Sequence, residues 1–356
     1  MEQLKRELTR ILQQYAEEGC YSNAVIAVFN RERVCFRLTY GETSPESVFD
    51  LASLTKLYTT TVLLKLLQER DIGVDTPVLK MLEAPEECRR LRARLETTTV
   101  RKLLTHTAGL PAWYPLYAAR GTRWERMELA LASEGRNVQP EMCYSDLGFM
   151  LAGWLAEQLA GKQLPELMET MIRKPLKIPC LTYLPHGNDM RMLDGREIVV
   201  SSYGNEIERQ MCEQRGICFD GFRSNGRAIQ GEANDGNAWY CFQGVSGHAG
   251  LFSDAAGVSA LGQFYLDTEG LLLREALCDQ GYGRGLGFEL GTRYPCGCGH
   301  TGFTGTSLYL SRELGVGGVL LTNRLANHRG AAPNLENCRI AVHTTIANNA
   351  AWIAHL

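Results

Sequence analysis

Lysine is scarce in this sequence. The 356-residue chain has 37 basic residues, but only eight of them are lysines, and none follows Lys177. Arginine stays protonated in proteins, so it cannot replace a lysine that accepts a proton during catalysis. A lysine beside a potential nucleophile is therefore more informative here than in a lysine-rich chain.

The chain also lacks a surplus of positive charge and a long hydrophobic run. Its formal net charge is −3, which argues against a nucleic-acid or anionic-membrane surface and favours a small-molecule or short-peptide substrate. The most apolar stretch, 148–161, is interrupted by Glu157 and is too short to span a bilayer. The first residues are charged where a signal peptide needs an apolar run. We predict a cytoplasmic protein with no membrane span, and its oligomeric state stays open.

Motifs of several enzyme classes are missing. No serine lies in G-x-S-x-G, which is the nucleophile motif of α/β-hydrolases. The chain has no H-E-x-x-H, no G-x-x-x-x-G-K-[ST] and no G-x-G-x-x-G after a predicted strand. Zinc proteases, P-loop NTPases and Rossmann dehydrogenases therefore have no motif support, and we predict that no cofactor is needed.

Twelve cysteines are present, most of them scattered singly. In a long chain without a predicted signal peptide we expect reduced thiols, not a disulfide framework. The dense cluster Cys296-Gly297-Cys298-Gly299-His300 lacks a second ligand pair at zinc-like spacing. We interpret it as small residues that allow a close backbone approach, and we predict no metal site. A thiol-based redox or metal protein is a hypothesis that depends on these cysteines alone.

Hydrophobic spacing outlines the organisation of the chain. It predicts helices over residues 3–18, 54–67, 100–104, 124–132, 147–159, 164–172, 254–266 and 336–348, and strands over 23–29, 34–40, 285–290, 306–310 and 317–322. Residues 185–240 are rich in Gly, Asn, Asp and Arg, so we expect long loops that line one side of a cleft.

These elements predict one catalytic domain with two regions. Residues 1–75 and 240–356 would form a discontinuous α/β region around a sheet built from both ends of the chain. Residues 76–239 would form a mostly helical, loop-rich region. The active site would lie at the junction of the two regions.

Ser53 and Lys56 form the first candidate pair. They are three residues apart at the start of a predicted helix, so both side chains lie on one face. Serine is a weak nucleophile until a neighbour takes its proton, and a buried lysine with a lowered pKa can do so. The helix N-terminus adds backbone N–H groups near the oxygen that becomes negative on acylation.

Two further elements complete the pattern. His300-Thr301-Gly302 precedes a predicted hairpin strand, whose edge can offer a backbone N–H opposite that of the nucleophile. A tyrosine followed two residues later by Asn or Asp occurs at Tyr21, Tyr144 and Tyr203. We favour Tyr144, because Tyr144-Ser145-Asp146 runs directly into a predicted helix.

Five blocks of the sequence resemble the β-lactamase-related serine hydrolases, in the order found in that family. They are FDLASLTKLYTT at 49–60, VRKLLTHTAGLP at 100–111, YSDLGFMLAG at 144–153, GVSGHAGLFSDA at 244–255 and GHTGFTGTSLYL at 299–310. This family includes class C β-lactamases, D-alanyl-D-alanine carboxypeptidases, D-aminopeptidases and esterases. The resemblance implies an α/β (α+β) fold of the penicillin-binding-protein type, with a central antiparallel sheet flanked by helices.

The resemblance also implies roles for individual residues. Ser53 matches the acylated nucleophile, Lys56 the lysine that shares in its deprotonation, and Tyr144 the phenol that exchanges protons with Ser53 and the leaving group. Which of Lys56 and Tyr144 is the formal base stays open. The backbone N–H groups of Ser53 and Phe303 match the oxyanion hole.

The resemblance implies that His300, Thr301 and Gly302 take part in substrate binding, but this motif departs from the family pattern. The family usually has lysine where this chain has His300, and an imidazole that is mostly neutral at pH 7 is a poor anchor for a substrate carboxylate. Asp146, which we also assign to substrate binding, stands where Asn is usual, and it is expected to hold Lys56 electrostatically and to raise its pKa. His106 and His248 are expected to fix loops, not to take part in catalysis.

We therefore predict a serine hydrolase that acts through an acyl-enzyme on an ester or amide. An esterase or a D-amino-acid peptidase fits better than a true β-lactamase, because recognition of a carboxylate is weakened. The alternatives are an acyltransferase on the same fold and a non-catalytic binding module that keeps the pocket.

Overall fold

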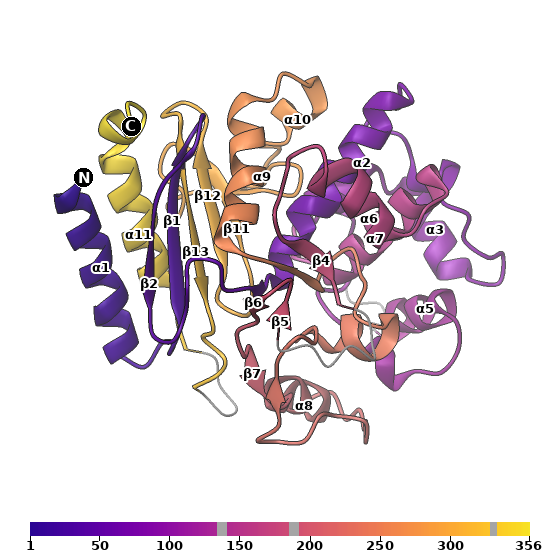
Figure 1. Ribbon diagram of the computed structural model, residues 1–356. Coiled ribbons are helices and arrows are strands. Elements are labelled where there is room, and N and C mark those ends of the chain that lie inside the picture. The colour runs from indigo at the N-terminus through magenta and orange to yellow at the C-terminus, as the bar shows by residue number, and fades with distance from the viewer. Residues whose placement is uncertain (134–140, 185–191, 328–332) are drawn as a thin grey trace.

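The computed structural model describes residues 1–133, 141–184, 192–327 and 333–356 (Figure 1). Its helices are α1 (Glu2–Glu17), α2 (Thr55–Glu69), α3 (Arg89–Thr97), α4 (Val100–Leu104), α5 (Arg123–Ser133), α6 (Asp146–Ala160), α7 (Leu164–Leu167), α8 (Glu206–Glu213), α9 (Ala255–Asp267), α10 (Leu271–Glu275), α11 (Glu336–Asn348) and α12 (Ala350–Ile353). Its strands are β1 (Ala24–Asn30), β2 (Val34–Tyr40), β3 (Phe49–Asp50), β4 (Leu181–Tyr183), β5 (Met192–Leu193), β6 (Arg196–Glu197), β7 (Ser202–Tyr203), β8 (Ala228–Ile229), β9 (Leu251–Ser253), β10 (Glu289–Leu290), β11 (Cys298–Thr301), β12 (Ser307–Ser311) and β13 (Val316–Thr322).

A six-stranded antiparallel sheet joins the two ends of the chain. Its strand order is β10-β11-β12-β13-β1-β2, so two N-terminal strands extend a sheet whose other four strands come from the C-terminal part. β1 pairs with β13 from Ala24 opposite Thr322 to Asn30 opposite Val316. Every residue of β1 is buried, which explains why its sequence is almost continuously apolar instead of alternating.

Helices cover both faces of this sheet. Figure 1 shows α1 and α11 on one face and α9 on the other. The side chains of β1 alternate accordingly. Val25, Ala27 and Phe29 belong to the large core that includes α9, while Ile26 and Val28 pack in the core formed with α1 and α11. The sheet is therefore a rigid layer from which β11 projects toward the helical part of the molecule.

The helical part is built around α2 and α6. Most residues of α2 are buried, and α6 is almost entirely apolar, as expected for helices that are surrounded by other elements. Gly153 of α6 lies against Gly247, and a Cβ atom at Gly153 would lie only 2.9 Å from the Gly247 Cα. The absence of a side chain at both positions brings the backbone around residue 248 close to α2 and α6.

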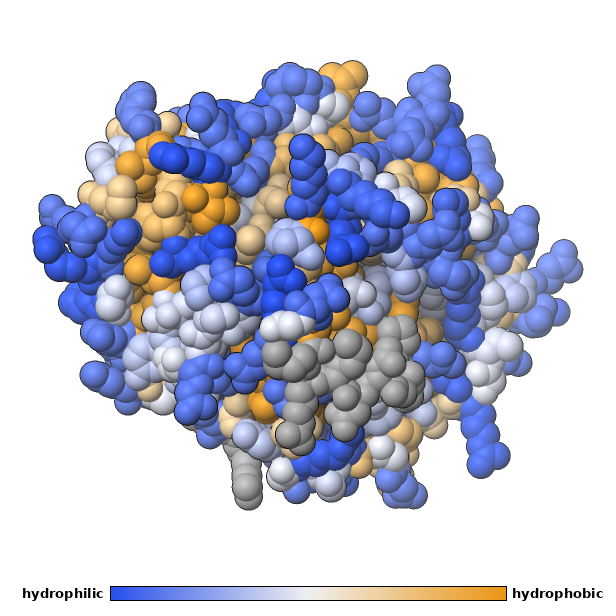
Figure 2. Space-filling view, in the orientation of Figure 1, coloured by the Kyte–Doolittle hydropathy of each residue, from blue (hydrophilic) through white to orange (hydrophobic). Residues whose placement is uncertain are grey.

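One face of the molecule is mostly polar. Figure 2 shows one face covered mainly by hydrophilic side chains, with smaller hydrophobic areas between them. Among the described residues, no helix is both long and apolar enough to cross a membrane. All twelve cysteines, which lie within the described ranges, are free thiols.

The predicted fold class is confirmed: an antiparallel central sheet is flanked by helices. The predicted helices at 3–18, 147–159, 254–266 and 336–348 are present as α1, α6, α9 and α11. The predicted strand over 285–290 is wrong for most of its length, because only Glu289 and Leu290 pair with β11. The sequence did not indicate β11, whose four residues include a glycine and are too few for a clear alternation.

The loop-rich stretch 185–240 is more ordered than its composition indicates. Its first seven residues, 185–191, lie outside the described ranges. The remainder holds α8 and the short strand pairs β5–β6 and β7–β8. Such short elements show no periodic pattern among frequent Pro, Gly and Asn residues, because tertiary contacts stabilise them and local sequence does not.

Candidate active site

Ser53 lies in a single 3-10 turn, Ala52–Leu54, between β3 and α2. Ala52 has a φ of 44°, a conformation that residues with a side chain seldom adopt. Asp50 holds this turn, because its Oδ1 accepts a hydrogen bond from the Ala52 N–H at 2.8 Å and its Oδ2 accepts one from the Asn234 N–H at 2.7 Å. Burial raises the pKa of Asp50 to about 6. The strained turn therefore places Ser53 at the N-terminus of α2.

Lys56 is fully buried one helical turn after Ser53. Its Nζ donates to Ser53 Oγ at 2.8 Å, to Asp146 Oδ1 at 2.7 Å and to the His248 carbonyl oxygen at 3.3 Å. Burial acts to lower the pKa of Lys56, but the charges of Asp146 and Tyr144 outweigh it, and the pKa is raised above its ordinary value. Lys56 is therefore an ammonium in the resting site, held by Asp146 as the sequence indicated.

Tyr144 lies immediately before α6, with its ring centre 5.0 Å from Lys56 Nζ. Burial raises the pKa of its phenol, although the Lys56 charge and hydrogen bonds with Lys56 and Ser53 act to lower it. His106 fixes the segment that carries Tyr144. The His106 ring lies 4.4 Å from the Tyr144 ring, and its Nδ1 accepts a hydrogen bond from the Ser145 N–H at 3.0 Å. Tyr144 is thus positioned at both Ser53 and Lys56.

The two alternative tyrosines lie elsewhere. Tyr21 is buried in the core formed by the chain ends, and its hydroxyl donates to the Leu12 carbonyl oxygen at 2.9 Å. Tyr203 is an exposed residue of β7 beside Glu206 and Phe303, and it does not line the pocket around Ser53. Of the three tyrosines, the structure brings only Tyr144 to the Ser53–Lys56 pair.

The segment after β11 is fastened to the turn that carries Ser53. Thr304 Oγ1 donates to the Asp50 carbonyl oxygen at 2.8 Å, and Thr306 Oγ1 donates to that of Leu51 at 3.0 Å. A Cβ atom at Gly302 would lie 2.5 Å from the Leu51 oxygen, so this close approach requires glycine. Within the described ranges, no backbone or side-chain acceptor takes the Phe303 N–H. That N–H is therefore available to a bound substrate.

His300 is buried within β11, 6.0 Å from the Tyr144 ring. Its Nδ1 lies 2.7 Å from the Thr301 carbonyl oxygen, which can only accept, so the Nδ1 carries the hydrogen. Burial and the Lys56 charge hold the pKa of His300 well below its ordinary value. Its Nε2 has no hydrogen-bond partner among the described residues. His300 is therefore a neutral ring with a free acceptor nitrogen, and it does not supply the positive charge of the usual lysine.

A pocket of about 160 Å³ opens beside Ser53. Its wall includes Ser53, Tyr144, Asp146 and Phe303, which the sequence indicated, together with Trp113, Glu208, Met211, Asn234, Asp235 and Ala249, which it did not. The expectation that the 185–240 stretch lines one side of the cleft is confirmed by the residues that it contributes. No local motif in the sequence marks Glu208 or Asp235 as a pocket residue.

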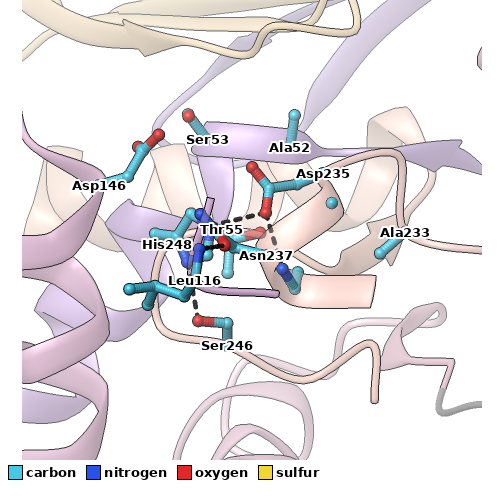
Figure 3. A network of polar contacts seen from close by, with 12 residues as sticks. Ala52, Ser53, Thr55, Leu116, Asp146, Ala233, Asp235, Asn237, Ser246 and His248 are labelled. Carbon is cyan, nitrogen blue, oxygen red and sulfur yellow. Dashed lines mark hydrogen bonds and ion pairs between the residues drawn. The ribbon is translucent and has the colours of Figure 1, made fainter. Parts of the chain in front are cut away.

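Asp235, which lines the pocket, pairs with His248. Asp235 Oδ1 contacts His248 Nε2 at 2.9 Å and accepts a hydrogen bond from the Ala238 N–H at 2.7 Å, and Ser246 Oγ contacts His248 Nδ1 at 2.7 Å. Figure 3 shows Ser53 and Asp146 next to this network. Because the His248 carbonyl oxygen accepts a hydrogen bond from Lys56 Nζ at 3.3 Å, this network also helps to hold Lys56 in place. This agrees with the expected structural role of His248.

The described residues that line the pocket include three with carboxyl side chains, Asp146, Glu208 and Asp235, and no lysine, arginine or histidine. Glu208 Oε1 accepts from the Gly236 N–H at 2.7 Å, and its Oε2 accepts from the Tyr117 hydroxyl at 3.1 Å. Burial, together with the charge of Asp235, raises the pKa of Glu208 to about 8. The pocket thus holds more negative than positive charge.

A sequence model of the Beta-lactamase family matches residues 8–342. The chain belongs to this family. Members of the Beta-lactamase family need not be β-lactamases, and the relatives of this chain carry several names. The family assignment confirms the resemblance inferred from the five sequence blocks.

Two curated relatives show the range of names. This family member is 26% identical over 356 aligned residues to the N-acetylmuramyl-L-alanine amidase of Bacillus subtilis (strain 168), and the alignment covers 85% of this chain and 77% of that protein. It is 29% identical over 236 residues to a protein of Salmonella paratyphi A that bears the name D-alanyl-D-alanine carboxypeptidase. That alignment covers 63% of this chain and 52% of the relative, so the chain spans about half the length of the Salmonella protein.

Solved structures share the fold at low sequence identity. The D-amino acid amidase from Ochrobactrum anthropi SV3 has a TM-score of 0.70 at 18% identity, with 97% of this chain and 99% of that chain covered. A class C β-lactamase from Rhodobacter sphaeroides has a TM-score of 0.69 at 16% identity, with 96% and 99% covered. The chain is thus a member of the Beta-lactamase family whose fold is that of β-lactamases and penicillin-binding-protein homologues.

Proposed function

We propose that the protein cleaves an ester or amide bond through an acyl-enzyme on Ser53. One observation carries the proposal: the buried Lys56 Nζ lies 2.8 Å from Ser53 Oγ, and Ser53 opens onto a pocket of about 160 Å³. A buried ammonium that donates to the serine oxygen stabilises negative charge on that oxygen and so favours its deprotonation, whereas a serine that serves only as a helix cap needs no such partner.

The ion pair favours Tyr144 over Lys56 as the group that takes the serine proton. An ammonium has three donors and no acceptor, so Lys56 cannot accept a proton while Asp146 holds it charged. In the proposed step the Tyr144 phenolate, which forms toward alkaline pH because burial raises the pKa of this phenol, accepts the proton of Ser53 Oγ as that oxygen attacks the carbonyl carbon. Tyr144 then returns this proton to the leaving group as the bond breaks.

Two backbone N–H groups are proposed to hold the oxyanion. The Ser53 N–H belongs to the turn at the start of α2, and the Phe303 N–H faces it from the segment after β11, which the hydroxyls of Thr304 and Thr306 fasten to residues 50–51. Donors placed before the reaction stabilise negative charge without reorganisation. Water then attacks the acyl-enzyme by the same proton transfers in reverse.

The charge of the site supports an ester or a D-amino-acid amide or peptide over a β-lactam. β-Lactams and D-alanyl-D-alanine peptides carry a carboxylate near the scissile bond, and His300 is a neutral acceptor where a cation would be needed. The acidic wall formed by Glu208 and Asp235 instead suits a substrate that carries a positive group. The name of one structural neighbour, D-amino acid amidase, agrees with this.

Labelling with a fluorophosphonate tests the proposal. We expect the wild type to be labelled at Ser53, as identified by peptide mass spectrometry, and Ser53→Ala to remain unlabelled. Ser133→Ala, at the exposed end of α5, is the matched control and should be labelled normally. Lys56→Met should lose labelling, whereas Lys65→Met on the same helix should keep it. Equal labelling of wild type and Ser53→Ala would show that the proposal is wrong.

A substrate panel separates the remaining functions. It contains p-nitrophenyl esters, D-amino-acid amides, D-alanyl-D-alanine peptides and nitrocefin, each assayed with wild type and Ser53→Ala. Faster release of the leaving group when an alcohol or amine is added would show that the acyl group is transferred to that acceptor and would identify an acyltransferase. Another structural neighbour, EstCE1, is described as a hydrolase with promiscuous acyltransferase activity. Failure to acylate with any substrate would favour a binding module.

A further inference from the structure

Arg339 of α11 is a buried arginine that donates to two backbone carbonyls, one of which belongs to the Gly302–Phe303 peptide. It is 6% exposed, and its Nη2 donates to the Gly302 carbonyl oxygen at 2.9 Å and to that of Thr306 at 3.2 Å. The nearby Glu336 is held by Arg293 at 2.7 Å, and Arg339 forms no ion pair in the described part of the chain. A buried charge without a counter-ion is costly, so its placement here calls for a reason.

The geometry of the peptide bond links Arg339 to the oxyanion hole. The described chain has no cis peptide bond, and in a trans peptide the C=O of one residue and the N–H of the next point in opposite directions. The Gly302 C=O points toward Arg339 and also accepts from the Gly305 N–H at 3.0 Å. The N–H of the same peptide, which belongs to Phe303, therefore points away from Arg339.

Hydrogen bonding at one end of a peptide strengthens the other end. A donor on the carbonyl oxygen polarises the amide and makes its N–H a better donor, and the effect is larger when the donor is charged and the surroundings are buried. We propose that Arg339 is a positioning residue that orients and polarises the Gly302–Phe303 peptide, so that the Phe303 N–H binds the oxyanion more strongly. This inference rests on the proposed acyl-enzyme function.

A second arginine provides an internal comparison. Arg324 Nε donates to the Phe303 carbonyl oxygen at 2.6 Å, and its guanidinium lies 5.1 Å from the centre of the Phe303 ring. The Phe303 carbonyl belongs to the next peptide, whose N–H is that of Thr304. Arg324 thus holds the same segment without polarising the Phe303 N–H. Loss of either arginine loosens the segment, but only loss of Arg339 weakens the oxyanion donor directly.

Paired oxygen and sulfur substrates distinguish polarisation from support of the fold. The full-length protein would be assayed with p-nitrophenyl acetate and with its thiono analogue, in which C=S replaces C=O. Sulfur accepts hydrogen bonds weakly. The kcat/KM of the oxygen ester divided by that of the thiono ester therefore reports the strength of the oxyanion hole. We expect Arg339→Met to reduce this ratio roughly tenfold, which is less than the loss on deleting an oxyanion donor itself.

Three further variants make the experiment specific. Arg339→Lys keeps a cation and should retain part of the ratio. Arg324→Met should lower both kcat/KM values by the same factor and leave their ratio unchanged. Arg312→Met removes an arginine that donates to the Thr268 carbonyl oxygen at 2.6 Å, away from Ser53, and should change neither the rates nor the ratio.

The outcomes separate this inference from the proposed function. An unchanged ratio in Arg339→Met, with both rates reduced, would show a purely structural role and overturn the inference while Ser53 chemistry stands. If Arg339→Met does not fold, as judged by circular dichroism, Arg339→Gln, which keeps an N–H donor without the charge, decides, and a wild-type ratio in that variant overturns the inference. If Ser53→Ala hydrolyses the esters as fast as wild type, the proposed function fails and the role of Arg339 fails with it.

Discussion

The Asp146–Lys56 ion pair influences the protonation of Lys56 and Tyr144. Asp146 Oδ1 lies 2.7 Å from Lys56 Nζ, and its negative charge raises the pKa of both Lys56 and Tyr144. A neutral asparagine at position 146 would leave both groups easier to deprotonate. The aspartate therefore moves the working range of the site toward alkaline pH, whichever of the two groups accepts the proton of Ser53.

We expect Asp146→Asn to shift the pH dependence of kcat/KM to lower pH. Both candidate bases act only in their deprotonated forms, and removal of the carboxylate charge favours deprotonation of the ammonium and of the phenol. The rise of kcat/KM with pH should move down by about one pH unit. The measurement is hydrolysis of a p-nitrophenyl ester between pH 6 and 10, corrected for the rate with Ser53→Ala.

Asp267→Asn is the matched control for this experiment. Asp267 pairs with Arg31 at 2.9 Å on the surface, away from Ser53, so its replacement should leave the profile in place. A shift of the Asp146→Asn profile to higher pH, or no shift at all, would contradict the role assigned to Asp146.

At the scale of elements, the site depends on two short segments that lie against each other. The turn after β3 presents Ser53, and the segment after β11 presents Phe303. The hydroxyls of Thr304 and Thr306 join them through the carbonyls of residues 50 and 51. Neither segment belongs to a long element, so their relative position is set by these contacts and by the missing side chain at Gly302.

We expect Gly302→Ala to impair catalysis more than stability. The added methyl group would lie 2.5 Å from the Leu51 carbonyl oxygen, so the two segments must separate. A misplaced oxyanion donor should reduce kcat/KM by about 100-fold, while the free energy of unfolding should fall by about 1–3 kcal/mol, the usual cost of overpacking. Ester hydrolysis and thermal unfolding measure the two effects.

Gly73→Ala is the control for this substitution. A Cβ atom at Gly73 would have no other atom within 4 Å, and the backbone there is not left-handed, so alanine should preserve activity and stability. Wild-type activity in Gly302→Ala would show that the segment after β11 does not supply an oxyanion donor.

The elements differ in how well the sequence predicts them. α1, α6, α9 and α11 have long stretches of regular apolar spacing, and such elements can be predicted from local pattern. β11 has only four residues, and α8 is short and lies in a stretch rich in glycine and asparagine. Both are stabilised by contacts with segments distant along the chain, and local periodicity carries no information about those contacts.

On the scale of the whole molecule, the pocket unites residues that are far apart in the chain. Ser53, Tyr144 and Phe303 were predictable because each lies in a short motif with a recognisable order. Glu208 and Asp235 were not, since nothing in their local sequence shows that tertiary packing turns them toward Ser53. Their charges matter for the substrate, and the net charge of −3 gave no hint of where the negative charge gathers.

The acidic wall predicts selectivity for a positively charged acyl or leaving group. Besides Lys56, a second cation near Tyr144 is Arg284, whose guanidinium lies 5.6 Å from the centre of the Tyr144 ring and does not line the pocket. Glu208 is surrounded by the Tyr117 hydroxyl, the Gly236 N–H, Asp235 and the more distant charge of Arg223. Since its pKa is raised to about 8, Glu208 is mostly protonated at pH 6.5 and mostly ionised at pH 9.

Three esters of similar size therefore test the charge of the pocket. Acetylthiocholine carries a permanent positive charge, 3,3-dimethylbutyl thioacetate is its neutral isostere, and a thioacetate ending in a carboxylate is the anionic counterpart. We expect kcat/KM to favour the cationic ester by roughly tenfold over the neutral one at pH 9, and this preference should shrink as the pH falls through about 8 and Glu208 gains its proton.

Glu208→Gln should remove the pH dependence of the preference, while Glu213→Gln at the exposed end of the same helix should leave it intact. Asp235→Asn should lower the preference at every pH. A preference for the anionic ester would contradict this assignment. If Arg284→Gln then abolished that preference for the anion, the charge recognition would lie at Arg284, on the opposite side of Tyr144.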